Sequence, residues 1–287
     1  MTTFLHKSYC IFCTFLVLCL FTACDGDIIT PSEPEIVIEG WIENDKQPVV
    51  IVTSTIPLTG DLQYVEDLEA YAIKSAKVKV SDGEKEVVLQ GMENKSYVPS
   101  YIYTTSDMIG EIGKNYQLTV DYENHHAEAT TSIQNIPCVD SLVVSPSEFS
   151  DTLFQVRAYL KDTEEKTNYY KIFTKVLPEE TTYYSYVGST IRDKVLLLHN
   201  GISVFSGQKF EDNDYVSDFS RSDTAFVKIT QVDEAGYRYW LDFEDMFLTV
   251  SNPIFPIRFN VHSNIRGGKG VWCGYGAVEK RAIFADF

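Results

Sequence analysis

The residue whose position predicts chemistry most directly is Cys24. An apolar run of about thirteen residues, 9–21, follows Lys7 and ends three places before this cysteine. A basic start, an apolar middle and small residues before a cleavage site are typical of a secretory signal peptide. Bacterial lipoproteins carry their acyl chains on a cysteine directly behind such a site. We therefore expect residues 1–23 to be a lipoprotein signal peptide and Cys24 to be the lipidated first residue of the mature chain.

A transmembrane helix is the alternative explanation for the apolar run. Such a helix needs about 20 apolar residues to cross ~30 Å of hydrocarbon, and this run is shorter. The charges behind it, Asp25 and Asp27, are acidic instead of basic. Each buried methylene group contributes ~0.8 kcal/mol to membrane binding, so several acyl chains on one cysteine give a stable anchor. The expected partner of Cys24 is therefore the lipid bilayer, with residues 24–34 as an acidic tether.

The composition predicts a folded, strongly acidic body. Apolar residues make up 44% of the 287 residues and aromatic residues 13%, which is ample for packed cores. The formal net charge is −17, and it becomes −18 once residues 1–23 are removed, because they hold one lysine and no acid. A body with this charge repels nucleic acid and anionic lipid head groups. We therefore expect neither as a partner, and we expect the lipid to be the anchor.

Two cysteines, Cys138 and Cys273, remain behind Cys24. The bacterial envelope is an oxidising compartment in which two thiols could pair. A bridge across a loop of this length would add about 4–5 kcal/mol through chain entropy. The two residues could equally be buried free thiols, and the sequence leaves both interpretations open. No CxxC pair or Cys/His cluster follows residue 24, so no zinc site is expected.

Other side chains that could do chemistry are scattered along the chain. His125 and His126 are neighbours on a predicted strand, so they point to opposite faces and cannot share one metal ion. His199 and His262 stand alone, and we expect local partners for both. The sequence contains no GxSxG, HExxH, Walker or Rossmann pattern. We therefore predict no catalytic residue, no metal site and no cofactor.

Carboxylates offer two further candidates. An acid-rich loop could supply oxygen ligands for calcium, although it lacks the order of an EF-hand loop. Its acids are Glu211, Asp212, Asp214 and Asp218. Glu244 falls inside the apolar arc of a predicted helix, where a buried carboxylate could act as a functional acid. We favour a structural explanation for Glu244, in which it pairs with an arginine or reaches solvent.

The elements that must position these residues are mainly β-strands. Asp82-Gly83 separates two segments of alternating polarity, which is the strongest short-range signal of a β-hairpin. Glu123-Asn124 marks a second tight turn. About seven short strands in about 100 residues are typical of a β-sandwich. We therefore predict an immunoglobulin-like or transthyretin-like sandwich over residues 35–136.

A second β-rich domain is predicted over residues 137–287, because Pro137 stops any strand from running through the junction. Near 233–250 the pattern becomes helical, with Asp233 as the expected N-cap. We expect this amphipathic helix to pack its aromatic face against a sheet. That face consists of Tyr237, Trp240, Leu241, Phe243, Phe247 and Leu248.

A glycine-rich segment, SNIRGGKG at 263–270, lies near the C-terminus. Loops that bind phosphate lie between a strand and a helix whose amides point at the anion. Here strands are predicted on both sides, and Gly270 follows Lys269 where a P-loop would have serine or threonine. We therefore expect a hairpin with closely packed backbone in place of a phosphate site.

Several segments together resemble a known family. They are the cysteine at position 24, EIVIEGWI at the start of the sandwich, the NYY of residues 168–170, FSGQKF at 205–210, and a closing NP followed by SNIRGGKGVWCGYG. The combination is similar to the Bacteroidetes lipoproteins catalogued as domain of unknown function 4249. The resemblance covers nearly all of the chain behind Cys24, and its most specific parts are Asn252-Pro253 and the SNIxGGxG segment.

This resemblance implies an outer-membrane lipoprotein made alongside a TonB-dependent receptor, with no catalytic residues to carry over. Asp25-Gly26-Asp27 resembles the tag that exports such lipoproteins to the cell surface, but it could also be a solvated tether. The periplasmic and extracellular faces therefore both stay open. We predict a non-enzymatic accessory binding protein. A surface adhesin or structural envelope protein is the alternative, and a hydrolase with a carboxylate-based site is the third hypothesis.

Overall fold

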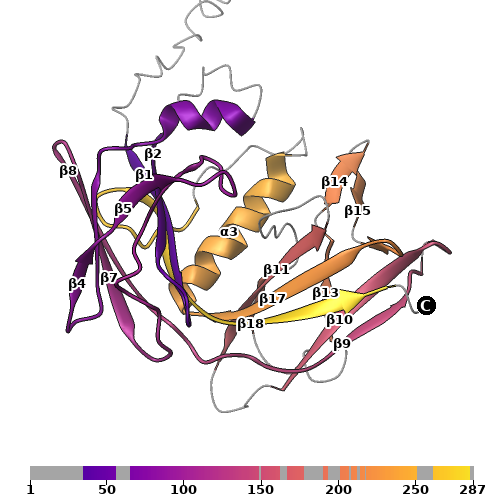
Figure 1. Cartoon of the computed structure of the whole chain (residues 1–287). Coiled ribbons are helices and arrows are strands. Elements are labelled where there is room, and N and C mark those ends of the chain that lie inside the picture. The colour runs from indigo at the N-terminus through magenta and orange to yellow at the C-terminus, as the bar shows by residue number, and fades with distance from the viewer. Residues whose placement is uncertain are drawn as a thin grey trace, which may run out of the picture. The chain divides into compact units, whose positions relative to one another are not determined.

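The computed structural model describes residues 35–55, 65–148, 150–161, 167–177, 190–192, 201–206, 208–211, 214–216, 218–250 and 261–284. The predicted signal peptide at 1–23, Cys24 and the tether at 24–34 lie outside these ranges. The described chain is mainly β-strand with one α-helix (Figure 1), which confirms the predicted fold class. The immunoglobulin-like or transthyretin-like topology stays a prediction.

An eight-stranded sheet is the centre of the fold. Its order is β12 (Thr190–Arg192), β11 (Tyr169–Leu177), β17 (Thr224–Val232), β18 (Lys269–Ile283), β1 (Ile36–Glu43), β2 (Val49–Ser54), β6 (Tyr101–Thr104) and β5 (Gln90–Glu93). Strand β18, near the C-terminus, runs parallel to β1 on one side and antiparallel to β17 on the other (Figure 1). The sheet thus joins strands from both ends of the chain.

Strand β18 also connects the two predicted domains. Its first half pairs with β1, from Lys269 beside Val37 to Tyr275 beside Glu43. Its second half continues along β17 as far as Ile283. The sheet therefore extends across the predicted boundary between residues 136 and 137, and the sequences on both sides of it share one layer. The boundary itself stays a prediction.

Two smaller sheets cover one face of the long sheet. One has the order β4 (Glu86–Val88), β3 (Lys77–Ser81), β7 (Asn115–Tyr122) and β8 (His125–Ser132). The other contains β13 (Ile202–Val204), β10 (Leu153–Lys161) and β16 (Phe219–Ser220), with β9 (Cys138–Pro146) also paired to β10. A separate hairpin consists of β14 (Gln208–Glu211) and β15 (Asp214–Val216).

Each smaller sheet encloses its own hydrophobic core against the long sheet. Trp272 of β18 lies in the first core, beside residues of β1, β3 and β7. Ala282 of the same strand lies in the second core, beside residues of β10, β11 and β17. Side chains ten positions apart on a strand point to the same face, because the period of a strand is two. Both cores therefore lie on one face of the long sheet, and its other face is left for the helix.

Local sequence chemistry explains the hairpins. In the turn between β3 and β4 the Asp82 carboxylate accepts hydrogen bonds from the backbone N–H groups of Glu84, at 3.0 Å, and Lys85, at 2.8 Å. Gly83 adopts a φ of 90°, which suits glycine. Glu123 takes a φ of 51° at the tip of the hairpin between β7 and β8. Both predicted turns are confirmed.

The helix α3 (Glu234–Val250) lies on the remaining face, in contact with β11, β17 and β18 (Figure 1). Asp233 is its N-cap, since the Asp233 carboxylate accepts a hydrogen bond of 2.8 Å from the N–H of Gly236. Tyr237 and Trp240 pack on buried side chains of the sheet, as predicted for the aromatic face. A 3₁₀ helix, η1 (Val65–Tyr71), follows β2 in sequence.

Candidate binding site

The face of the long sheet beneath α3 contains buried charges. Lys171 of β11 is fully buried, and its ammonium group donates a hydrogen bond to the carboxylate of Glu244 on α3. Its Nζ lies 4.7 Å from the ring centroid of Trp240, a cation–π contact. Burial lowers the pKa of Lys171, and the negative charge of Glu244 opposes that change. This pair fastens the helix to the sheet.

A second buried lysine lies on the neighbouring strand β17. The Nζ of Lys228 is 3.2 Å from one carboxylate oxygen of Glu43, and the Nζ of Lys46 is 2.6 Å from the other. The ring of Phe173 lies 5.0 Å from the Lys228 ammonium. Burial lowers the pKa of Lys228, against the effect of Glu43. Because each of these charges has an opposite partner, this part of the face holds the structure together, and none of these charged groups is free to meet a ligand.

The same face carries an open groove over β1 and β2. The groove has a volume of about 170 Å³. Strand residues form part of its lining, and η1 and the segment before β6 supply the rest. The lining residues are Val37, Glu39, Ile51, Thr53, Ser54, Leu68, Tyr71, Val98 and Pro99. Six of these nine contribute apolar or aromatic surface, and Glu39 is the one that carries a charge.

Glu39 has no hydrogen bond or ion pair with any residue that the structure describes. The side chain is exposed to solvent, yet the protein around it displaces enough water to raise the pKa of its carboxyl above the ordinary value. Its charge is also felt by Tyr239 and Tyr275, whose pKa values are raised first by burial and further by Glu39. An unpartnered carboxylate in a largely apolar groove is a candidate ligand-binding group.

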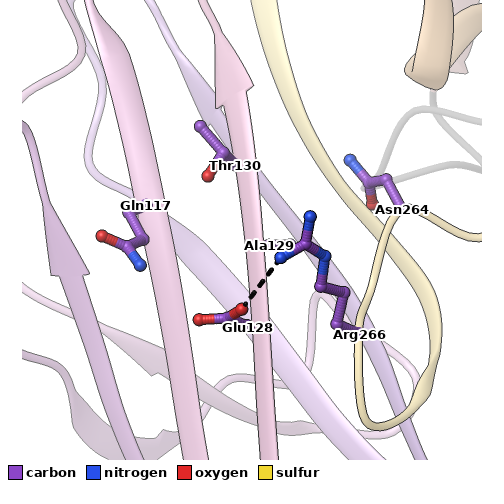
Figure 2. Close-up of a pocket in the computed structure, with 6 residues that line it drawn as sticks. All are labelled: Gln117, Glu128, Ala129, Thr130, Asn264 and Arg266. Carbon is purple, nitrogen blue, oxygen red and sulfur yellow. Dashed lines mark hydrogen bonds and ion pairs between the residues drawn. The ribbon is translucent and has the colours of Figure 1, made fainter.

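A larger hollow lies where the glycine-rich loop meets β8 (Figure 2). Its volume is about 340 Å³, and its lining is Gln117, Glu128, Ala129, Thr130, Asn264 and Arg266. The Arg266 guanidinium lies 3.4 Å from the Glu128 carboxylate and points toward it (Figure 2). The Arg266 side chain is 85% exposed, so water screens this pair. Despite its size, the hollow offers no unpaired charge, and the groove around Glu39 is the better candidate.

The sequence matches the family described as Domain of unknown function (DUF4249) over residues 25–281. The chain belongs to this family. A comparison with curated proteins found no match. The family domain begins at residue 25, directly behind Cys24. None of the helices in the described ranges is long and apolar enough to span a bilayer.

The glycine-rich loop of this DUF4249 domain packs its backbone tightly, as predicted. Arg266 forms an isolated β-bridge with Glu128 of β8, with N–H···O distances of 2.9 and 3.0 Å. Gly267 has a φ of 80°, and a Cβ there would lie 2.1 Å from the His126 carbonyl oxygen. The Asn264 side chain bonds both backbone groups of Trp272, at 2.8 and 2.9 Å. The partner of the loop is β8, whereas the sequence suggested a hairpin; Asn252-Pro253 lies outside the described residues.

The two cysteines of the DUF4249 domain are free thiols, so the structure does not contain the bridge that the sequence left open. Cys138 is exposed at the start of β9, whereas Cys273 is fully buried in β18. A Cβ built on Gly236 of α3 would lie 2.5 Å from the Cys273 Sγ, so the helix seals this thiol directly. Burial raises the pKa of Cys273 well above its ordinary value.

The histidines have separate surroundings. His126 Nδ1 lies 2.7 Å from a carboxylate oxygen of Asp121 at the surface. His125 Nδ1, by contrast, is buried and has no hydrogen-bond partner in the part of the chain that the structure describes. The backbone N–H of His262 donates to Asp242 at 2.8 Å. His199 lies outside the described residues. The two neighbouring histidines therefore do not act together.

Part of the acid-rich loop lies within the described residues. Asp212 lies outside the described residues, as do the side chains of Glu211 and Asp214. Asp218 is buried and accepts a hydrogen bond from the Ser147 hydroxyl. Nowhere in the described ranges do three or more His, Cys, Asp or Glu side chains gather so that they could hold a metal ion.

The structure adds something to the sequence-based interpretation of two carboxylates, Glu244 and Glu39. Glu244 has an ion-pair partner, as expected, but the partner is Lys171 and no arginine is needed. Glu39 was not predicted as a site residue at all. A signal was present, because the segment around it is apolar on both alternating faces, Ile36 and Ile38 on one, Val37 and Trp41 on the other. An acid in a strand of this kind is an exception that points to a specific role.

Proposed function

We propose that this DUF4249 protein is a non-enzymatic, lipid-anchored binding protein of the outer membrane that assists a TonB-dependent transport receptor. The observation that carries the proposal is the start of the family domain at residue 25, one position behind Cys24. An apolar run of about thirteen residues precedes that cysteine. This is the order expected when an acylated cysteine becomes the first residue of a mature domain. The acyl chains then hold the acidic body at the membrane, on its periplasmic or extracellular side.

The lining of the groove supports binding in preference to catalysis. Hydrolysis of a glycosidic bond ordinarily uses two carboxyl groups on either side of the scissile bond, and the lining contains one, Glu39. Nucleophilic catalysis needs a base within hydrogen-bonding reach of the nucleophile. Thr53 and Ser54 line the groove, but no histidine does. The groups present can recognise a ligand and orient it.

The anchor is tested by replacing Cys24 with serine in the full chain and fractionating the cells. We expect the unmodified protein in the membrane fraction. The Cys24→Ser variant should be in the soluble fraction or be retained as an uncleaved precursor, and in either case it should incorporate no labelled fatty acid. Cys138→Ser is the matched control, because Cys138 is an exposed thiol of the folded domain. Labelling of Cys24→Ser at the level of the control would contradict the anchor.

The receptor is tested by purifying the tagged protein from native membranes in mild detergent. We expect a TonB-dependent receptor to copurify. A lone, monodisperse protein under every growth condition would contradict this part of the proposal. Deletion of the gene provides the second measurement, since loss of uptake supports the transport role. Loss of attachment or matrix with normal uptake would favour a surface adhesin or structural envelope protein instead.

A further inference from the structure

We propose that the groove around Glu39 binds a primary ammonium group carried on a short alkyl chain. The inference adds a ligand class to the proposed function and rests on it only in assigning the groove a binding role. It is drawn from the unpartnered carboxylate, from the lining of the groove and from its volume.

The charge of Glu39 selects for a cation. The neighbouring acid on the same face, Glu43, is held by Lys228 and Lys46, whereas Glu39 has no such partner among the described residues. Where apolar groups displace part of the water around a carboxylate, an opposite charge or a hydrogen-bond donor stabilises its ionised form. The net charge of −17 adds a long-range attraction for cations. A neutral or anionic ligand would leave the carboxylate without a partner.

The lining selects for a cation that is apolar on one side. Val37, Ile51, Leu68, Val98 and Pro99 offer surfaces against which methylene groups can pack. The remaining polar residues of the lining, Thr53, Ser54 and Tyr71, carry hydroxyl oxygens that can accept hydrogen bonds. An ammonium group has three donors and no acceptor, which matches one carboxylate and a few hydroxyl oxygens.

The volume limits the size of the ligand. Sites for drug-sized molecules enclose about 300–1,000 Å³, and this groove encloses about 170 Å³. A chain of about four carbons with a terminal ammonium is of the right order. A hard metal ion is a poorer match, because calcium takes about six to eight oxygen ligands and the lining holds one carboxylate. A free alkylamine and the lysine side chain of another polypeptide share the favoured chemistry.

The proposal is tested by NMR titration of the purified full-length protein in detergent, with n-butylammonium chloride as the probe. The matched neutral probe is 1-butanol, which has the same number of heavy atoms. We expect butylammonium to shift the resonances of the groove and to bind about ten-fold or more tightly than 1-butanol, as a charge-assisted hydrogen bond predicts. Equal affinities for the two probes would overturn the proposal.

Variants locate the effect. Glu39→Gln keeps the size of the side chain and removes its charge, so it should abolish the preference for butylammonium. Glu84→Gln, at the exposed tip of the hairpin between β3 and β4, is the control and should leave the preference unchanged. Leu68→Trp fills the groove from η1 and should weaken both probes. An undiminished preference in Glu39→Gln, in a sample that unfolds in urea like the unmodified protein, would contradict the assignment.

Two further probes distinguish the sources of the ammonium. A short alanine peptide with one central lysine is compared with the same peptide carrying norleucine. If the lysine peptide binds more tightly than butylammonium, the ligand is part of a polypeptide; if it binds more weakly, the ligand is a small amine. Both results support the site. The site is overturned if the lysine and norleucine peptides bind equally and butylammonium and 1-butanol also bind equally. A failed titration would leave the fractionation of Cys24→Ser unaffected, so the two proposals fail separately.

Discussion

Glu39 and Glu43 lie four residues apart on β1 and face the same side of the sheet, yet their surroundings are opposite. Glu43 is 5% exposed and its two oxygens are bound by Lys228 and Lys46. Glu39 is exposed in a groove and has no partner among the described residues. The difference arises from the neighbours of each position. Glu43 stands beside Tyr275 of β18, within reach of Lys228 on β17. The residues beside Glu39, by contrast, are the apolar Val271 and Ile51.

The same difference separates the two parts of this face of the sheet, the part beneath α3 and the part over β1 and β2. Under the helix, the charges of Lys171 and Glu244 neutralise each other and connect two elements. Over β1 and β2, where η1 and the Val98-Pro99 segment complete the lining of the groove, Glu39 is the one charged residue of the lining and has no partner among the described residues. A buried ion pair fixes how elements pack, and an unpaired charge in an accessible groove selects a ligand. The following predictions test whether the two parts of the face differ in this way.

The largest effect is expected from breaking the buried pair under α3. Lys171→Met removes the ammonium group and takes the ion pair with Lys171 away from the buried Glu244 carboxylate. Loss of one partner of a buried ion pair costs about 3–5 kcal/mol, so we expect the free energy of unfolding to fall by this amount. Urea unfolding of the purified protein measures it.

The matched control for this prediction is the double variant Lys171→Met with Glu244→Leu. Replacing both charges with apolar side chains of similar size is often neutral or stabilising, so most of the lost stability should return. If the double variant is as unstable as Lys171→Met alone, packing around Trp240 matters more than the charge, and the comparison loses its electrostatic basis.

A second prediction compares the two acids of β1 directly. Glu43→Gln weakens charge-assisted hydrogen bonds from two lysines and should lower the free energy of unfolding by about 1.5–3 kcal/mol. Glu39→Gln removes a charge that has no partner among the described residues, so its effect should stay within about 0.5 kcal/mol, as for surface substitutions. Urea unfolding at neutral pH measures both. Equal losses in the two variants would show that Glu39 also has a structural role.

Local signals in the sequence predicted part of this architecture well. The helix begins behind Asp233, as its side-chain chemistry requires, and the turns at Asp82-Gly83 and Glu123-Asn124 are where the sequence placed them. Each of these features is decided within a few residues, by a cap or by a backbone conformation that few residue types adopt. The mainly β character follows in the same way from alternation along each strand.

The groove could not be predicted, because its parts are distant in sequence. The parallel pairing of β18 with β1 has no local signal, and it decides that Tyr275 stands beside Glu43 and that Val271 stands beside Glu39. Likewise, no pattern near Glu244 predicts that its ion-pair partner is Lys171 on β11. The apolar arc of the predicted helix singled out Glu244, whereas Glu39 was not predicted as a site residue. Only the arrangement of the strands shows which acid has a partner and which does not.

A smaller effect is expected where the helix touches the sheet most closely. Alanine is favoured over glycine inside a helix by about 1 kcal/mol. At Gly236, however, the added methyl group would collide with the Cys273 Sγ, and overpacking costs about 1–3 kcal/mol. We expect Gly236→Ala to lower the free energy of unfolding by about 1 kcal/mol. In a Cys273→Ala background the methyl group has room, so the same change should become stabilising. A loss of equal size in both backgrounds would mean that the thiol does not set the distance between helix and sheet.

The smallest effect concerns the ionisation of the Cys273 thiol. The helix α3 shields this thiol from water, whereas Glu39 in the groove is exposed to water. In the unfolded chain this thiol ionises around its ordinary pKa of 9.0, whereas burial raises the pKa of the folded thiol well above that value. The folded state therefore keeps a proton that the unfolded state releases, and stability falls as the pH rises through 9. Between about pH 8.5 and 9.5 the thiol should account for a loss of about 0.7 kcal/mol. The buried lysines 171 and 228, whose pKa values are lowered, act in the opposite direction, and both remain in Cys273→Ala. The difference in urea unfolding between the unmodified protein and Cys273→Ala therefore isolates the thiol, and a difference that does not change with pH would show that water reaches it beneath the helix.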